Sequence, residues 1–408
     1  MKLPSEFVLP NYNGRSLANV PATVAKLLNV TFKGAHPLQP ALWQPLGSDI
    51  QRVVVFLVDA LGWNIIQRQQ EKLSPLLARA QVADTITSVF PSTTVNALSS
   101  IWTGTPPAQH GLVGLRLFFP EYAVLGQMIK LKPNFYDAPD ALTKAGLKAK
   151  DFLATPGASG QFVRQRVAVH HFKGHEIVDS ALSVMHGRGS TADHGATTVA
   201  DMLVKTRQLI ENNLDKKLFA YLYWPTVDTL SHAYGPFGEA VTAEVHTILH
   251  QVETILMDGL SAAAKKGTAV IIMSDHGQTN TPISQHVYVD DHPHLKKMLL
   301  MRSAGEPRVP VLYAKQGKVQ AVLDYINSEL SETAVALTSD EALDLGLLGN
   351  GPYAPHTRDR LGDIVMIMRN GALYLNPEEV SKAQKTNGRH GGLTADEMNA
   401  TWLGFRLA

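Results

Sequence analysis

Cysteine is absent from all 408 residues of the chain. Its absence excludes disulfide bonds, a thiol nucleophile and a cysteine-ligated metal, although it leaves the cellular compartment open. An excess of charge of either sign is also missing, because Lys and Arg total 37 while Asp and Glu total 36. A surface for nucleic acid or for an anionic membrane is therefore not expected.

Long apolar runs are missing as well. No stretch reaches the roughly 18 apolar residues that a membrane-spanning helix needs. The first residues contain one early lysine and no continuous apolar segment, so they do not resemble a signal peptide. We expect a soluble, cytoplasmic protein, and the 45% of hydrophobic residues can form an ordinary globular core.

Three short apolar runs have the composition of strands that are buried on both faces. They lie at 52–59, 218–224 and 268–275 and show no clean alternation of polar and apolar residues. Between the last two, apolar positions in 239–267 recur every three or four residues, which predicts an amphipathic helix that ends near Gly267. A strand, a long helix and a strand predict a parallel α/β sheet.

The sequence changes character between about 280 and 360. This segment is rich in Gly and Pro and holds one further helical pattern, after which an apolar run at 363–368 resembles the earlier strands. We therefore expect a core formed by 1–280 and 360–408, with an inserted cap region at 281–359.

Candidate site residues lie at the end of the first apolar run and just before the helical pattern that follows residue 94. Asp59 ends the first strand, where open α/β sheets bind ligands, although a turn or helix-cap aspartate is an equal alternative. Ser92, Thr93 and Thr94 come just before a helical pattern. Such residues usually cap helices, but a helix N-terminus also suits a nucleophile and an incoming phosphate. Composition alone does not separate the three hydroxyls.

Aspartate and histidine also follow the other strands. Asp228 and His232 are four residues apart, so one helical turn places both on the same face. Asp275 and His276 are adjacent, and both can reach one ion only if the chain turns, which Gly277 permits. A helix cap with an unrelated histidine is the alternative for the first pair.

A third histidine, His390, stands among glycines near the C-terminus. Taken alone it is a loop residue. Together, however, three aspartates and three histidines follow strands or occupy adjoining loops, and this ligand set without cysteine suits zinc or manganese. Six such ligands are enough to hold two ions, which can clamp both the attacking and the leaving oxygen in phosphoryl transfer.

The order of these motifs resembles the alkaline phosphatase superfamily, and within it the nucleotide pyrophosphatase/phosphodiesterase-like (type I phosphodiesterase) branch. The motifs are LVDALG (57–62), FPSTT (90–94) with TGTPPAQHG (103–111), DTLSHAYGP (228–236), SDHGQ (274–278) and HGGLT (390–394). The resemblance covers about 52–278 and 360–400. It implies a three-layer αβα sandwich around a mostly parallel central sheet, with a smaller inserted cap region.

The resemblance also implies two metal sites and a nucleophile. The first ion would be held by Asp228, His232 and His390. The second would be held by Asp59, Asp275 and His276, together with the oxygen of the nucleophile. The pattern places the nucleophilic threonine at Thr94, with Thr93 as the alternative. The two divalent ions would be Zn²⁺ or, alternatively, Mn²⁺.

The implied activity is metal-dependent hydrolysis of phosphodiester or nucleotide pyrophosphate bonds in a small-molecule substrate through a phosphothreonine intermediate. Asn96, or a backbone N–H near Thr94, could contact a non-bridging oxygen of the phosphoryl group. Alternatives on the same scaffold are a phosphomonoesterase, a phosphonate hydrolase or a phosphomutase. An alternative of another class is a non-catalytic metal-binding protein.

Two departures from the superfamily's patterns narrow the choice. The sulfatase signature is absent, and no arginine follows Thr94 until Arg116, which favours diesters over monoesters. His110 matches a family position, and we expect it to be structural. The remaining histidines without a motif are expected at the surface or at helix caps, and they include His170, His171, His286, His292 and His294.

Overall fold

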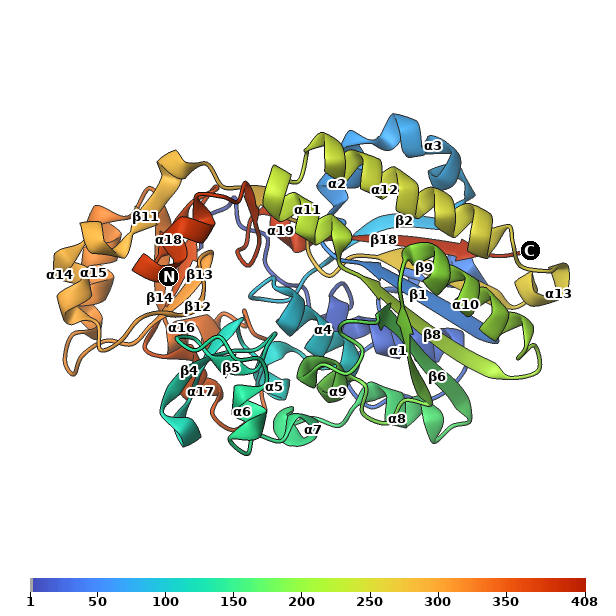
Figure 1. Ribbon diagram of the computed structural model, residues 1–408, viewed down its shortest axis with the longest axis horizontal. Coiled ribbons are helices and arrows are strands. Elements are labelled where there is room, and N and C mark those ends of the chain that lie inside the picture. Colours follow the sequence, from blue (N-terminus) through green and yellow to red (C-terminus); the bar gives the residue numbers. More distant parts are fainter. Residues whose placement is uncertain (1–2) are drawn as a thin grey trace.

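The computed structural model describes residues 3–408, and a seven-stranded sheet forms the core of the right-hand part of the molecule in Figure 1. The strand order is β2-β18-β9-β1-β8-β6-β7. Six strands run parallel and only β18 is antiparallel to its two neighbours. The strands are β1 (Arg52–Val58), β2 (Val82–Thr87), β6 (Val167–Gly174), β7 (Ala192–Ala196), β8 (Lys217–Trp224), β9 (Thr268–Met273) and β18 (Asn399–Arg406).

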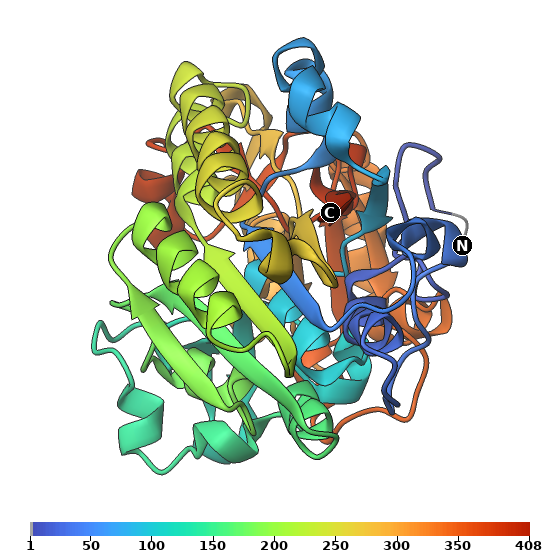
Figure 2. The same cartoon turned by 90° about the vertical axis from the view of Figure 1, so that its right-hand side faces the viewer.

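Helices cover both faces of this sheet, which gives the three layers that the sequence predicts (Figures 1 and 2). On one face lie α2 (Trp63–Arg68), α3 (Gln70–Arg79), α10 (Val199–Glu211), α11 (Thr226–Tyr234) and α12 (Glu239–Gln251). On the other lie α1 (Val20–Leu27), α4 (Thr94–Thr103) and α8 (Ala158–Val163). Alternate residues of β1 enter the two opposite cores, as the two-residue period of a strand requires.

The predicted helix at 239–267 is divided into three parts. α12 passes into a π-helical turn at Val252–Met257, and the short α13 (Ala262–Lys265) follows. The apolar residues of α12 still face the central core, so the periodicity predicted the buried face correctly.

A second seven-stranded sheet lies beside the core, with the order β14-β15-β13-β12-β3-β4-β5. Its strands are β3 (Arg116–Phe119), β4 (Val124–Gln127), β5 (Lys132–Pro133), β12 (Ala304–Glu306), β13 (Val309–Leu312), β14 (Ala334–Thr338) and β15 (Ile364–Met368). The apolar run at 363–368 was expected to be a strand of the core. It forms β15, which instead pairs with β13 and β14 in the second sheet. The domain boundaries at 280 and 360 stay a prediction.

Shorter elements complete the fold. Two-stranded ladders join β10 (Thr279–Asn280) to β17 (Gly388–Arg389) and β11 (His286–Tyr288) to β16 (Leu373–Leu375). The other helices are α5 (Pro107–His110), α6 (Ala141–Lys144), α7 (Ala149–Phe152), α9 (Ala181–His186), α14 (Pro293–Met298), α15 (Val319–Glu329), α16 (Ser339–Asp344), α17 (Thr357–Leu361), α18 (Pro377–Ala383) and α19 (Ala395–Met398). Among residues 3–408, no helix combines the length and the apolarity that crossing a bilayer requires.

A fully buried ion pair joins the second sheet to the C-terminal segment. Arg308 donates from Nε and Nη2 to the two carboxylate oxygens of Glu397, over 2.8 and 2.7 Å. The same carboxylate accepts the backbone N–H of Gly392 and the hydroxyl of Thr394. The pair therefore holds the loop that follows His390 in place.

We expect Glu397→Ala to lower the free energy of unfolding by about 3–5 kcal/mol, because it leaves the Arg308 charge buried without a partner. Glu378→Ala is the control, since it removes an exposed ion pair with Arg302 and should cost less than about 1 kcal/mol. Urea denaturation of the three proteins measures both values. Equal losses in the two variants would show that burial of the pair is unimportant.

Candidate active site

The predicted site residues meet at the carboxyl edge of the central sheet. Asp59 follows β1, and Asp275 and His276 follow β9. Asp228 and His232 lie one turn apart in α11, which begins directly after β8. Because β1, β8 and β9 are parallel neighbours, their carboxyl ends bring these side chains together.

Glycine is needed at position 277, but for a different reason from the one that the sequence suggested. A Cβ atom there would lie 2.1 Å from the carbonyl oxygen of Asp396 and 3.1 Å from the Cα of Gly62. Glycine is therefore required because two backbone segments approach closely, not because the turn needs a left-handed conformation. This close packing fixes Asp275 and His276 against the loop that follows β1.

Two groups of side chains could each hold a metal ion. The first contains Asp228, His232 and His390, and the second contains Asp59, Asp228 and His276. The Nε2 atoms of His232 and His390 each lie 3.5 Å from Oδ1 of Asp228. Asp228 thus stands between the two groups, a bridging position that sequence reasoning did not assign to it.

Asp275 completes the second group. Its Oδ2 lies 3.3 Å from Nε2 of His276, which in turn lies 3.5 Å from Oδ1 of Asp59. The Oδ2 atom of Asp275 and the Oδ1 atom of Asp59 are buried and have no hydrogen-bond partner among the described residues. Two orphaned carboxylate oxygens are costly unless a cation compensates them.

Each of the three histidines directs its Nδ1 atom at a backbone carbonyl. Nδ1 of His232 donates to the carbonyl of Gly388, over 2.7 Å, and Nδ1 of His390 donates to the carbonyl of Ser92, over 2.9 Å. Nδ1 of His276 lies 3.1 Å from the carbonyl of Gly277. With Nδ1 as the donor, each Nε2 keeps its lone pair, which is the tautomer of a metal-binding histidine.

The electrostatics of the cluster also fit a cation. Burial, together with the neighbouring Asp228, raises the pKa of Asp275 to about 7, although backbone hydrogen bonds to its carboxylate lower it in part. Burial and the charges of Asp275 and Asp228 raise the pKa of Asp59. Burial would also raise the pKa of Asp228, but the three nearby histidines lower it overall. Like charges are crowded here, and a divalent ion would relieve their repulsion.

Burial is the main cause that lowers the pKa of two of the histidines. It lowers the pKa of His390 to about 4 and that of His276 also falls, with the other histidines of the cluster adding to the effect. Both imidazoles are therefore neutral near pH 7, the state in which a histidine binds a metal. The donor set and its protonation thus fit a pair of divalent ions.

Thr94 is the first residue of α4 and its hydroxyl faces the cluster. Oγ1 lies 3.2 Å from Nε2 of His276 and 3.4 Å from Oδ2 of Asp59. Thr93 is the N-cap residue, and its hydroxyl instead lies beside the buried carboxyl of Glu306, whose pKa burial raises and Thr93 lowers in part. Ser92 bonds to the backbone of Gly391 and Gly392 and so holds the His390 loop.

Asn96 and His110 lie outside the cluster. The amide of Asn96 donates to the carbonyl of Pro91, over 3.4 Å, so the side chain faces the turn before α4. His110 lies 3.0 Å from the hydroxyl of Ser100, and its Nδ1 accepts the backbone N–H of Leu112. Burial lowers the pKa of His110 to about 3. These contacts are those of a structural histidine.

Sequence reasoning missed two polar side chains that contact the candidate ligands. Tyr223 donates to Oδ2 of Asp59, over 2.5 Å, and was concealed within an apolar strand pattern. Gln278 donates to Oδ1 of Asp228, over 2.6 Å. It directly follows Asp275, His276 and Gly277, so its position beside the ligands was a signal that could have found it.

Among the histidines expected at the surface or at caps, His171 is an exception. It is buried in β6, where Nδ1 bonds to Asp193 and Nε2 to Ser159. His294 is exposed and His292 is the N-cap of α14, as expected. Val167 and Val169 enter the core on the face of β6 that is covered by α4. Because side chains alternate along a strand, His171 lies on that same face.

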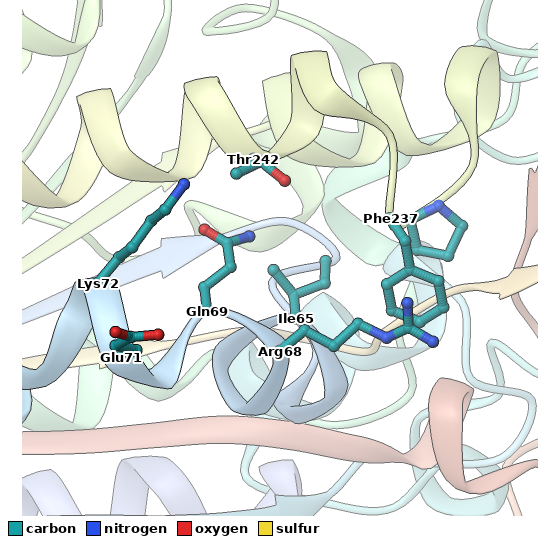
Figure 3. A pocket seen from close by; sticks show the side chains of 8 residues that line it. Ile65, Arg68, Gln69, Glu71, Lys72, Phe237 and Thr242 are labelled. Atoms are coloured by element: carbon teal, nitrogen blue, oxygen red, sulfur yellow. The ribbon is translucent and has the colours of Figure 1, made fainter.

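A cavity of about 680 Å³ opens beside Thr94, Asp59 and Asp228. Its wall includes aromatic residues of α4 and β8 and residues of 129–140 and 171–186. A second hollow, of about 220 Å³, lies between α2, α3 and α12 and contains none of the candidate ligands (Figure 3). There the guanidinium of Arg68 stacks 3.6 Å from the ring centre of Phe237.

Known proteins resemble the chain in fold. Murine ectonucleotide pyrophosphatase/phosphodiesterase 5, an inactive threonine-to-alanine variant in complex with AMP, is 18% identical with a TM-score of 0.65, over 87% of this chain and 88% of that one. Phosphonoacetate hydrolase from Sinorhizobium meliloti 1021, in complex with phosphonoformate, is 16% identical with a TM-score of 0.65, over 88% and 91%. A comparison with curated protein sequences finds no match.

Sequence comparison with family models gives the assignment. Residues 53–393 match the model of the type I phosphodiesterase/nucleotide pyrophosphatase family. The match spans all five motifs up to the glycines after His390. The chain therefore belongs to the type I phosphodiesterase/nucleotide pyrophosphatase family, a family of phosphoric ester hydrolases in the alkaline phosphatase superfamily.

Proposed function

We propose that the protein is a metal-dependent hydrolase of phosphodiester or nucleotide pyrophosphate bonds, with Thr94 as its nucleophile. One observation carries the proposal: three histidines direct Nε2 toward three aspartates, and the Thr94 hydroxyl lies within 3.4 Å of two members of this set. Asp228, His232 and His390 would hold one ion, and Asp59, Asp275, His276 and Thr94 the other, with zinc or manganese as the metal.

The position of Thr94 suits nucleophilic attack. When bound, the two ions would lower the pKa of the threonine hydroxyl and offset charge on the phosphoryl oxygens. The Thr94 oxygen forms a bond to phosphorus while the bond from phosphorus to the leaving oxygen breaks. Water then cleaves the phosphothreonine and restores the hydroxyl.

The N-terminus of α4 supports the same step. Its first backbone N–H groups have no partner within the helix, so they can donate to a non-bridging phosphoryl oxygen. This backbone contact replaces Asn96 in our proposal, because the Asn96 amide is directed at Pro91. His232 and His390 are held by backbone carbonyls and so keep a fixed orientation during turnover.

A diester is favoured over a monoester because, among the described residues, no arginine lines the cavity beside Thr94. Arg116, the first arginine after Thr94, pairs with Glu379 over 2.7 Å in the second sheet. The relatives' complexes with AMP and with phosphonoformate support a small substrate that contains a phosphoryl or phosphonyl group.

Paired assays test the choice of substrate. We expect the zinc- or manganese-loaded protein to hydrolyse bis(p-nitrophenyl) phosphate faster than p-nitrophenyl phosphate, and a chelator to abolish both reactions. Faster release from the monoester would favour a phosphomonoesterase. Turnover of neither ester, with phosphonates and nucleotides also inert, would favour the non-catalytic metal-binding alternative.

A further inference from the structure

The cavity beside Thr94 follows helix α4 away from the metal cluster. Thr94, Leu98 and Trp102 all line it, and they lie four residues apart on one face of the helix. Eight residues of α-helix span roughly 12 Å, so the cavity extends well beyond a phosphoryl group bound at Thr94. An organic group of the substrate has room to lie along this wall.

The middle of the cavity is aromatic. The ring of Trp102 packs edge-on against Tyr221, with centroids 4.5 Å apart, and lies 4.1 Å from the ring of His171. The Tyr221 hydroxyl is buried and has no hydrogen-bond partner among the described residues. This stretch suits a flat or apolar group that carries an acceptor for one hydroxyl.

A buried cation also lines the cavity. Lys173, near the end of β6, is only 7% exposed. Because β6 and β8 pair with His171 opposite Tyr221, Lys173 follows two residues later on the same face of the sheet. Lys173 lies near the Trp102 end of the cavity. Its charge lowers the pKa of the buried His186, and Nε2 of His186 lies 2.9 Å from the hydroxyl of Ser99 in α4.

The Lys173 ammonium forms an ion pair with Asp193, but no hydrogen bond from it is found among the described residues. Its nearest acidic atom is Oδ1 of Asp193, at 3.7 Å, which is longer than a hydrogen bond. The Asp193 carboxylate is already engaged by His171, over 2.9 Å, and by Ser190, over 2.8 Å. Burial lowers the pKa of Lys173, a cost that an anionic ligand group would offset.

The other acidic groups on the cavity wall do not neutralise this lysine. Glu176 and Asp179 are exposed, so water and salt screen their charges, although Asp179 still raises the pKa of Lys173. Asp140 lies next to Pro139 on the 129–140 segment of the wall, and Asp59 and Asp228 belong to the metal cluster. Lys173 is therefore a largely buried cation whose ion pair with Asp193 leaves its N–H groups free to donate inside the cavity that holds the nucleophile.

We propose that Lys173 selects the substrate, and that the enzyme acts on phosphodiesters whose organic group ends in an anionic oxygen group such as a carboxylate. This inference rests on the proposed function, since it assumes that Thr94 attacks the phosphorus. The substrate would place its phosphoryl group at Thr94, its apolar part along Leu98 and Trp102, and its anionic end on Lys173.

Two matched substrates test this assignment. The first is the methyl phosphodiester of para-(carboxyethyl)phenol, and the second carries a carboxamide in place of the carboxylate. The ethyl spacer keeps the two leaving groups chemically alike. We expect kcat/KM to be roughly 10- to 100-fold higher for the carboxylate, the effect of one hydrogen bond to a charged group.

Variants assign the preference to a residue. Lys173→Met should reduce the preference to about threefold or less and leave turnover of the carboxamide nearly unchanged. Lys130→Met is the matched control, because Lys130 also lines the cavity but is exposed, so its loss should preserve the preference. Equal loss on both substrates in Lys173→Met, or loss of the preference in Lys130→Met, would overturn the proposal.

A binding measurement separates this proposal from the proposed function. Calorimetry with the corresponding benzylphosphonate monomethyl esters, in which CH₂ replaces the bridging oxygen, gives a ratio of Kd values that needs no turnover. A preference for the carboxylate without hydrolysis of either diester would retain the Lys173 site and reject the phosphodiesterase. Hydrolysis of both diesters with a Kd ratio near one would retain the phosphodiesterase activity and reject the Lys173 site.

Discussion

Thr94→Ala is expected to lower kcat on a phosphodiester by roughly 10⁴-fold or more, because it removes the attacking oxygen. Thr93→Ala is expected to change kcat by less than about tenfold. The two hydroxyls are one residue apart, but Thr94 faces His276 and Asp59 whereas Thr93 faces Glu306. Steady-state kinetics on both variants, with the same metal loading, measure the difference.

The metal content of the two variants serves as the control. Thr94→Ala should retain both ions, since six other ligands remain, so that loss of activity with metal retained identifies a nucleophile. The reverse pattern, with Thr93→Ala inactive and Thr94→Ala active, would move the nucleophile to the N-cap position. Activity in both single variants would reject covalent catalysis by either threonine.

Asp228→Ala is expected to lower kcat roughly 10³-fold or more and to weaken the binding of both ions. Its Oδ1 atom lies 3.5 Å from Nε2 of both His232 and His390, and Asp228 also belongs to the group with Asp59 and His276. Loss of an ion removes several kcal/mol of charge stabilisation in the transition state. Mass spectrometry of the purified variant, alongside kinetics, measures both effects.

Chelation of the parent protein should reproduce the loss and also lower the melting temperature, because ions that bind only the folded state stabilise it. Asp258→Ala is the control variant, since that aspartate forms an exposed ion pair with Arg79 and belongs to neither group of candidate metal ligands. It should keep full activity and metal content. Full activity of the parent after exhaustive chelation would reject metal-dependent catalysis.

Much of the architecture could be predicted because it depends on local patterns. The apolar runs at β1, β8 and β9 and the three-to-four spacing of α12 were sufficient for a parallel sheet covered by helices. The five motifs fixed the order of the site residues along the chain. Parallel strands then bring their carboxyl ends to one edge, which explains why Asp59 and His276, which are 217 positions apart, can meet.

Other features depend on pairings that no local pattern encodes. β15 has the composition of a core strand, yet it pairs in the second sheet, because partner choice is set by long-range contacts. The bridging position of Asp228 and the role of Tyr223 follow from the relative placement of α11 and β8. The cavity along α4 depends on five separate segments, so the charge of Lys173 on its wall was not predictable either.

The most direct test is anomalous X-ray diffraction from crystals of the protein grown with zinc. We predict two peaks about 4 Å apart, the usual spacing of paired catalytic ions, with one beside Asp228, His232 and His390 and the other beside Asp59, Asp275, His276 and Thr94. A single ion elsewhere, or no peak at this edge of the sheet, would contradict the assignment.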